Sequence, residues 1–155
     1  MYYRTLYYNT VLGKDKIIMH KRRKKLVVAI LLFLFIGVAS YLQWGRETDV
    51  YSNITSTSKN YHEEHITFTL NQLFVADKEK CAEEIIKQCR ENTFPSVLFS
   101  YDMSKPNALY GTVYLSSFGV QWQKPVFTFR YVQKADKLGS YNIVDNPEAF
   151  TLTID

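Results

Sequence analysis

The feature that most constrains this chain is an uninterrupted apolar segment near its N-terminus. The segment 26–45 reads LVVAILLFLFIGVASYLQWG and contains no charged residue. A helix rises about 1.5 Å per residue, so this segment would form a helix roughly 30 Å long, which matches the hydrocarbon thickness of a bilayer. The sequence therefore predicts a transmembrane helix or signal anchor over residues 26–45. Representative residues of the predicted membrane span are Leu26, Leu32, Phe35, Val38 and Trp44.

Basic residues directly before the apolar segment predict its orientation. Residues 1–25 contain eight Lys or Arg residues and one acidic residue, and the basic residues end in the cluster Lys21, Arg22, Arg23, Lys24 and Lys25. Because Lys and Arg beside a membrane helix are retained on the cytoplasmic side, residues 1–25 are predicted to be a cytoplasmic tail. The C-terminal part is then predicted to lie outside the cell membrane.

The net charge of the whole chain is a poor guide to its binding partners. The net charge is +4 at pH 7, but the part beyond residue 45 is net negative because the positive charge is concentrated in the tail. A nucleic-acid-binding protein needs its positive charge on the folded domain. The sequence therefore gives no indication of nucleic-acid binding, and its predicted partners are the lipid bilayer and an unknown extracytoplasmic protein or ligand.

A cleaved signal peptide is the alternative to an anchor. Val38-Ala39-Ser40 offers small residues for cleavage, and cleavage near Ser40 would release a secreted protein. Two features favour the anchor: the apolar segment continues through Leu42, and Tyr41 and Trp44 at its outer end suit the aromatic belt of a membrane interface. Both alternatives remain open from the sequence.

The part beyond the apolar segment divides into a predicted linker and a predicted domain. Residues 46–60 are rich in Ser, Thr and Asn and have no sustained period, which is typical of a linker. From residue 61 the pattern becomes regular, beginning with an alternation of apolar and polar residues over 65–70 that predicts a strand. Asp77 is the predicted cap of an amphipathic helix that ends before Pro95.

Residues 61–155 are predicted to form one α+β domain. Strand-like patterns recur over 97–101, 109–115, 125–132 and 150–154, separated by turn residues. This order predicts a β-α-β-β-β-β ectodomain in which one helix packs on an antiparallel meander, in outline cystatin-like. One helix cannot cover both faces of a sheet, so one face is expected to be partly open.

The Cys and His residues give no catalytic or metal-binding signature. Cys81 and Cys89 would lie about 12 Å apart along one helix, too far for a disulfide, and are predicted to be buried free thiols. His62 and His65 stand three apart in HEEH, and in a strand they would point to opposite faces, which argues against a metal site. No catalytic, cofactor-binding or metal-binding residue is predicted, and none of the GxSxG, GxGxxG or CxxC motifs occurs.

Aromatic residues are the remaining distinctive feature of the predicted domain. Phe118, Trp122 and Tyr131 are the candidate interaction residues, since aromatic side chains are favoured anchors of binding surfaces. The alternative for Trp122 is that it folds back on the sheet.

The sequence thus predicts a single-pass membrane-anchored protein with a non-catalytic extracytoplasmic binding domain and no cofactor. In general layout the chain is similar to bacterial membrane-anchored immunity proteins, which neutralise toxins that attack the outer membrane leaflet. The alternative is an extracytoplasmic or secreted small enzyme, or a processed factor, with an unrecognised carboxylate site.

Overall fold

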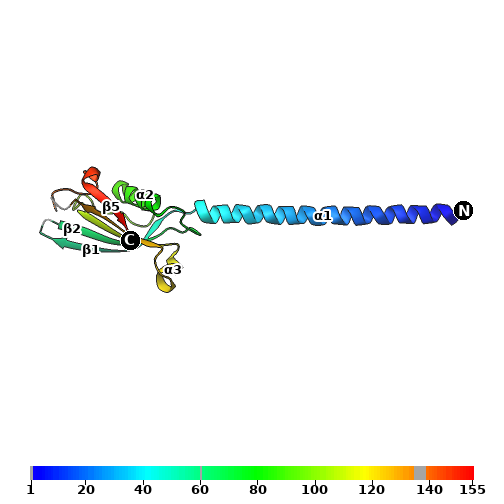
Figure 1. Ribbon diagram of the computed structural model, residues 1–155, viewed down its shortest axis with the longest axis horizontal. Coiled ribbons are helices and arrows are strands. Elements are labelled where there is room, and N and C mark those ends of the chain that lie inside the picture. Colours follow the sequence, from blue (N-terminus) through cyan, green and yellow to red (C-terminus); the bar gives the residue numbers. More distant parts are fainter. Residues whose placement is uncertain (1, 60, 135–138) are drawn as a thin grey trace. The chain divides into compact units, whose positions relative to one another are not determined.

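The computed structural model describes residues 2–59, 61–134 and 139–155, with side chains from Arg22 onward, so the side chain of Lys21 lies outside the described part. The chain divides into two compact units, of which the second begins at Leu42. Helix α1 (Tyr2–Trp44) forms the first unit as far as Tyr41, and its last residues belong to the second unit (Figure 1). Its portion Arg22–Trp44 is long and apolar enough to cross a membrane, which is consistent with an anchor or a signal sequence.

The second unit is an α+β fold built on one mixed sheet, so the α+β part of the predicted fold class is confirmed. The strands lie in the order β1-β2-β3-β4-β5. Their bounds are β1 (Asp49–Ser58), β2 (Tyr61–Thr69), β3 (Ala108–Tyr114), β4 (Phe127–Gln133) and β5 (Phe150–Ile154). The unit also contains helices α2 (Lys78–Glu91) and α3 (Ser117–Trp122) and the 3-10 helix η1 (Pro147–Ala149).

Residues 49–58 form strand β1, so the prediction of a linker over 46–60 was wrong for most of that segment. β1 pairs antiparallel with β2, from Asp49 opposite Thr69 to Ser58 opposite Tyr61. An edge strand with little burial needs no apolar alternation, and β-branched Thr residues suit a strand. The folded domain therefore begins well before residue 61.

The prediction of an antiparallel meander was also wrong, because β2 and β3 run parallel. Parallel neighbours need a long crossover connection, and residues 70–107 supply one that contains α2. Residues 97–101, predicted as a strand, belong to that connection and form no strand. The pairs β3–β4 and β4–β5 are antiparallel, as expected.

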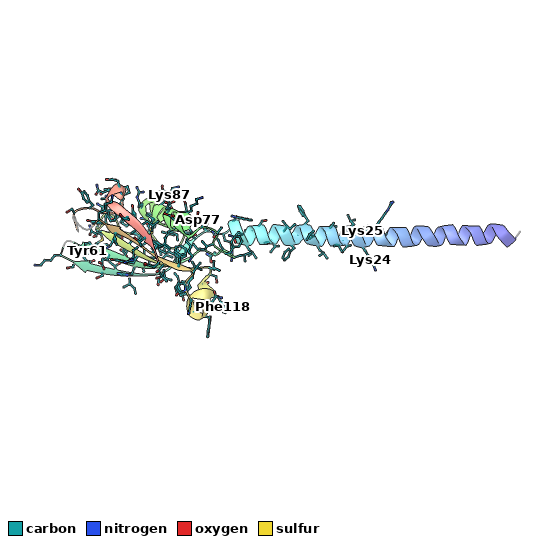
Figure 2. All side chains as sticks on the ribbon, viewed as in Figure 1. Lys24, Lys25, Tyr61, Asp77, Lys87 and Phe118 are labelled. Carbon is teal, nitrogen blue, oxygen red and sulfur yellow. The ribbon has the colours of Figure 1, made fainter. Side chains whose placement is uncertain are left out.

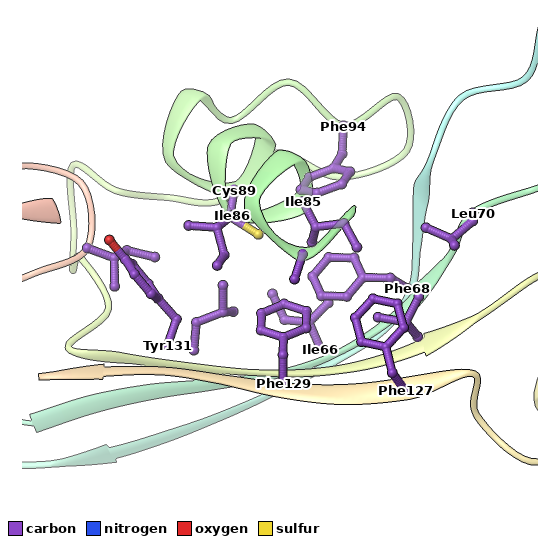
Figure 3. Packing of buried hydrophobic residues seen from close by; sticks show 14 of the residues in the cluster. Ile66, Phe68, Leu70, Ile85, Ile86, Cys89, Phe94, Phe127, Phe129 and Tyr131 are labelled. Atoms are coloured by element: carbon purple, nitrogen blue, oxygen red, sulfur yellow. The ribbon is translucent and has the colours of Figure 1, made fainter. Parts of the chain in front are cut away.

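Helix α2 covers one face of the sheet. Asp77 caps its first turn by accepting hydrogen bonds from the backbone N–H groups of Glu79 and Lys80, and Asn92 ends it in the left-handed conformation. Figure 3 shows the apolar side of α2 facing the sheet, where the rings of Phe68 and Phe129 stack with centroids 6.1 Å apart. The buried residues of α2 are Ala82, Ile85, Ile86 and Cys89. Burying each large side chain of this kind stabilises the fold by about 1.5–3 kcal/mol.

The opposite face of the sheet carries polar side chains. A row of directly paired residues crosses all five strands: Ile54, His65, Tyr110, Arg130 and Thr153. The rings of His65 and Tyr110 stack at 4.5 Å, and Arg130 forms an ion pair of 2.9 Å with Asp155. His65, Arg130 and Thr153 are exposed, so this face is partly open to solvent.

Candidate functional site

Helix α3 carries two of the three predicted interaction residues on its surface. The hydroxyl of Ser116 caps the helix by accepting a hydrogen bond of 3.3 Å from the N–H of Gly119. Phe118 and Trp122 are 67% and 73% exposed, and their ring centroids lie 6.5 Å apart. Trp122 therefore does not fold back on the sheet. Figure 2 labels Phe118 on α3, away from the helix α2 that covers the other face.

Tyr131 was wrongly predicted as an interaction residue, because it is buried. Alternation along β4 places Phe127, Phe129 and Tyr131 on the same side, and that side faces α2 (Figure 3). The Tyr131 hydroxyl donates to the carbonyl oxygen of Pro147 at 2.8 Å, and its ring stacks on Phe150. Tyr131 thus belongs to the core.

A groove with one polar wall and one largely apolar wall lies beside β1, and sequence reasoning did not find it. One wall consists of Asn53, Thr55 and Thr57 on β1 together with His62 and Glu64 on β2. The other wall is the irregular segment 97–104 of the connection before β3. The groove has a volume of about 410 Å³.

A hydrogen-bonded chain runs along the wall of this groove that β1 and β2 form. The two oxygens of Glu64, a residue only 6% exposed, bond to the hydroxyl of Thr55 and to Nε2 of His62, both at 2.8 Å. The other ring nitrogen of His62, Nδ1, lies 3.1 Å from the hydroxyl of Thr57. When Nε2 carries the proton, Nδ1 accepts from Thr57. A buried carboxyl group is tolerated only when it is paired in this way.

The alternation of side chains along β2 explains why the HEEH sequence forms two separate His–Glu pairs, one on each face of the sheet. Thr55 lies opposite Glu64 and Thr57 opposite His62, on the α2 side of the sheet. Glu63 and His65 point to the open face, where His65 Nε2 lies 3.4 Å from a carboxylate oxygen of Glu63. Within the described residues, His, Cys, Asp and Glu side chains form no group of three or more that could hold a metal ion.

The wall formed by 97–104 is tied to the end of α2. Asn92 exchanges two hydrogen bonds of 2.8 Å with the backbone of Phe99, and the Tyr101 hydroxyl donates to the carbonyl of Cys89 at 2.6 Å. Burial raises the pKa of Tyr101, which keeps this donor protonated. Leu98 and Met103 remain 78% and 85% exposed, so the wall presents apolar side chains to solvent.

At the same groove, the backbone of β1 presents groups that have no hydrogen-bond partner among the described residues. The backbone groups of His62 and Leu70 face β3. His62 bonds through its N–H and C=O to Asn107, just before β3, and the Leu70 N–H donates to the carbonyl of Tyr114 at the end of β3. The β2 residues between these positions, at 63, 65, 67 and 69, therefore form their backbone hydrogen bonds with β1. The β1 residues opposite them direct their own backbone groups toward β2. The outward-facing backbone groups of β1 then belong to Asn53, Thr55 and Thr57. No strand lies beyond β1 among the residues that the structure describes.

The two cysteines contribute no reactive group to this groove. Both thiols are free; Cys89 is buried and Cys81 is half-buried. Burial raises the pKa of Cys81 to about 11 and raises that of Cys89 as well, so both stay protonated at neutral pH. A protonated thiol is a poor nucleophile.

Comparison with family models, with curated proteins and with solved structures returns no match. The cystatin-like outline therefore stays a prediction.

Proposed function

We propose that this chain is a single-pass membrane protein whose extracytoplasmic domain binds an extended polypeptide segment along β1. One observation carries the proposal: Asn53, Thr55 and Thr57 supply both the outward-facing backbone groups of an edge strand and one wall of a groove. A peptide added to this edge would form main-chain hydrogen bonds with these residues. Its alternate side chains would enter the groove.

The composition of β1 supports this function. Edge strands are usually protected against added strands by charged residues or prolines. The stretch 50–58 reads VYSNITSTS and contains neither, and residues 51–58 are all exposed. Leu98 and Met103 offer apolar contacts across the groove, while the Thr55–Glu64–His62 chain offers polar ones. Main-chain bonds would supply affinity and the groove would supply selectivity.

The continuity of α1 supports an anchor over a cleaved signal. The helix continues without interruption through the candidate cleavage residues Val38–Ser40 and ends at Trp44. Gln43 is buried and hydrogen bonded to the backbone of Leu73 and Phe74. An anchored chain keeps the basic cluster on the cytoplasmic side and the domain outside.

The binding mode can be tested with the full chain in lipid nanodiscs and a displayed library of random peptides. Asn53→Pro removes one outward-facing N–H, a change that an edge strand tolerates. Asn53→Ala is the matched control, because it removes the same side chain and keeps the N–H. We expect peptides selected on the unmodified chain to bind the alanine variant and to lose binding to the proline variant. Equal binding to both variants, or no enrichment, would contradict the proposal.

The hydroxyl–imidazole–carboxylate chain favours one second candidate, a small hydrolase. In the order Thr57–His62–Glu64, the imidazole could accept the hydroxyl proton while the carboxyl group orients the ring. A fluorophosphonate probe, which labels activated hydroxyl nucleophiles, tests this directly. Labelling at Thr57 that is lost in His62→Ala would favour the hydrolase, whereas an unlabelled Thr57 would remove it.

A further inference from the structure

Large apolar side chains are exposed at one end of the domain. Trp44 is 75% exposed, and Leu73 and Phe74 in the turn before α2 are 48% and 53% exposed. Phe118 and Trp122 on α3 add two more exposed rings. We refer to these five residues as the aromatic end.

Hydrogen bonds bring these three segments together. The Gln43 side chain, next to Trp44, bonds to the backbone of Leu73 and Phe74. The chain just before that turn pairs with the end of β3: Leu70 donates to Tyr114 at 2.9 Å and Gln72 donates to Leu115 at 3.1 Å. Helix α3 begins two residues after Leu115. All three segments therefore meet at the end of the sheet where β2 and β3 stop, and Figure 1 shows α3 there, on the side of the sheet opposite α2.

We propose that the aromatic end docks on the outer interface of the bilayer that holds α1. This inference rests on the proposed anchoring. Trp44 is the last residue of the apolar helical segment, so it lies where an aromatic belt forms at a membrane interface. Gln43 holds the turn at Leu73 and Phe74 beside it, which gives the aromatic end continuity with the membrane segment.

The chemistry of α3 fits the same environment. Phe118 and Trp122 stand four residues apart, which places them on one side of a helix, and their rings lie close enough to form one apolar surface. Amphipathic segments with Phe and Trp bury their apolar side at the boundary between headgroups and acyl chains. Lys124, exposed just after α3, suits anionic headgroups.

Fluorescence quenching by brominated lipids tests this docking, because the chain contains only two tryptophans. The full chain is reconstituted into vesicles of phosphatidylcholine and phosphatidylglycerol brominated near the headgroup end of the acyl chains. Trp44→Phe leaves Trp122 as the reporter, and Trp122→Phe leaves Trp44. We expect both reporters to lose fluorescence in brominated vesicles relative to unbrominated ones.

A second substitution makes the result specific to the aromatic end. Phe118→Ser in the Trp44→Phe background should reduce the quenching of Trp122. Ile54→Ser, which removes an exposed apolar side chain from β1, should leave the quenching unchanged.

The outcomes separate docking from anchoring. Quenching of both reporters supports the docking. Quenching of Trp44 without quenching of Trp122 overturns the docking and leaves the anchor intact. A chain that fails to remain with the vesicles, with neither reporter quenched, overturns both.

Discussion

The buried side chain of Gln43 links the last turn of α1 to Phe74 in the turn before α2. Its Nε2 donates to the carbonyl oxygen of Phe74 at 3.0 Å, and its Oε1 accepts from the N–H groups of Leu73 at 3.1 Å and Phe74 at 3.3 Å. One amide thus satisfies three backbone groups in a turn that has no regular secondary structure. The polar residue near the end of an apolar segment therefore has a structural role in the domain.

Substitution of Gln43 by Ala is expected to destabilise the domain. It leaves the three backbone groups without their partner, which costs about 1–3 kcal/mol when such groups stay buried. Urea unfolding of the full chain in nanodiscs, followed by circular dichroism, measures the loss. The matched control is Gln121→Ala, at an exposed glutamine of α3. Equal stability of the two variants would contradict the role assigned to Gln43.

Gly111 is required by the position of the Phe129 ring. A Cβ atom added at Gly111 would overlap with the ring of Phe129, a residue directly opposite on β4. Gly111→Ala should therefore lower the stability by roughly 1–3 kcal/mol, as overpacking does in other cores. Thermal unfolding measures this effect. Phe129→Leu in the alanine background should restore part of the melting temperature, and a further decrease would contradict the steric explanation.

Thr55 is expected to stabilise the fold through Glu64. Thr55→Val keeps the shape of the side chain but leaves one oxygen of a buried carboxyl group without its donor, at a cost of about 1–3 kcal/mol. Ser56→Ala, at the neighbouring exposed position, is the control and should be close to neutral. A denaturation series that ranks Ser56→Ala as the more harmful change would show that the hydrogen bond is unimportant.

The raised pKa of Cys81 predicts slow alkylation. Its pKa of about 11, against an ordinary value of 9.0, lowers the thiolate fraction at pH 8 by about a hundredfold. Reaction of the folded chain with iodoacetamide, followed by mass spectrometry, should therefore be slow at Cys81 and slower still at the buried Cys89. Reaction at the rate of the urea-unfolded chain would contradict this.

The same shift makes the domain sensitive to alkali. Because the folded pKa is raised, the contribution of Cys81 to stability is fully present below about pH 9 and is lost as the pH rises through about 11. Cys81→Ala should reduce this alkaline loss in urea unfolding at pH 7, 9 and 11. If Cys81→Ala loses as much stability at alkaline pH as the unmodified chain, the loss comes from titratable groups other than Cys81.

The topology can be tested by protease treatment of intact cells or spheroplasts that express the chain with a tag at each end. An outward-facing anchored domain predicts loss of the C-terminal tag and a protected N-terminal fragment. Full protection of the C-terminal tag would contradict the orientation. A released product that begins near Tyr41 would instead indicate a cleaved signal.

The elements that sequence could predict are those with a strong local pattern. Helix α2, with its Asp77 cap, follows from apolar spacing, and β3, β4 and β5 follow from alternation. Strand β1 lacks that alternation because most of its side chains are exposed on both faces. The parallel pairing of β2 and β3 depends on where the long connection returns, which no local pattern encodes.

The candidate groove could not be predicted for the same reason. Its chain from Thr55 to Glu64 and from Thr57 to His62 exists only in the register of β1 against β2. Alternation did place Tyr131 with Phe127 and Phe129, but a period of two cannot say which side of a strand a helix will cover. The exposure of Phe118 and Trp122 likewise depends on the short helix α3.

The start of β1 at Asp49 also limits the places where the domain could bind a ligand. Only residues 45–48 separate the apolar helix from the sheet, and four extended residues reach at most about 14 Å. Under the proposed anchoring, a tether this short keeps the domain close to the bilayer. If the chain is anchored and binds along β1 as proposed, its partner has to come to the bilayer itself, so the domain would suit ligands that are already at the surface of the lipid.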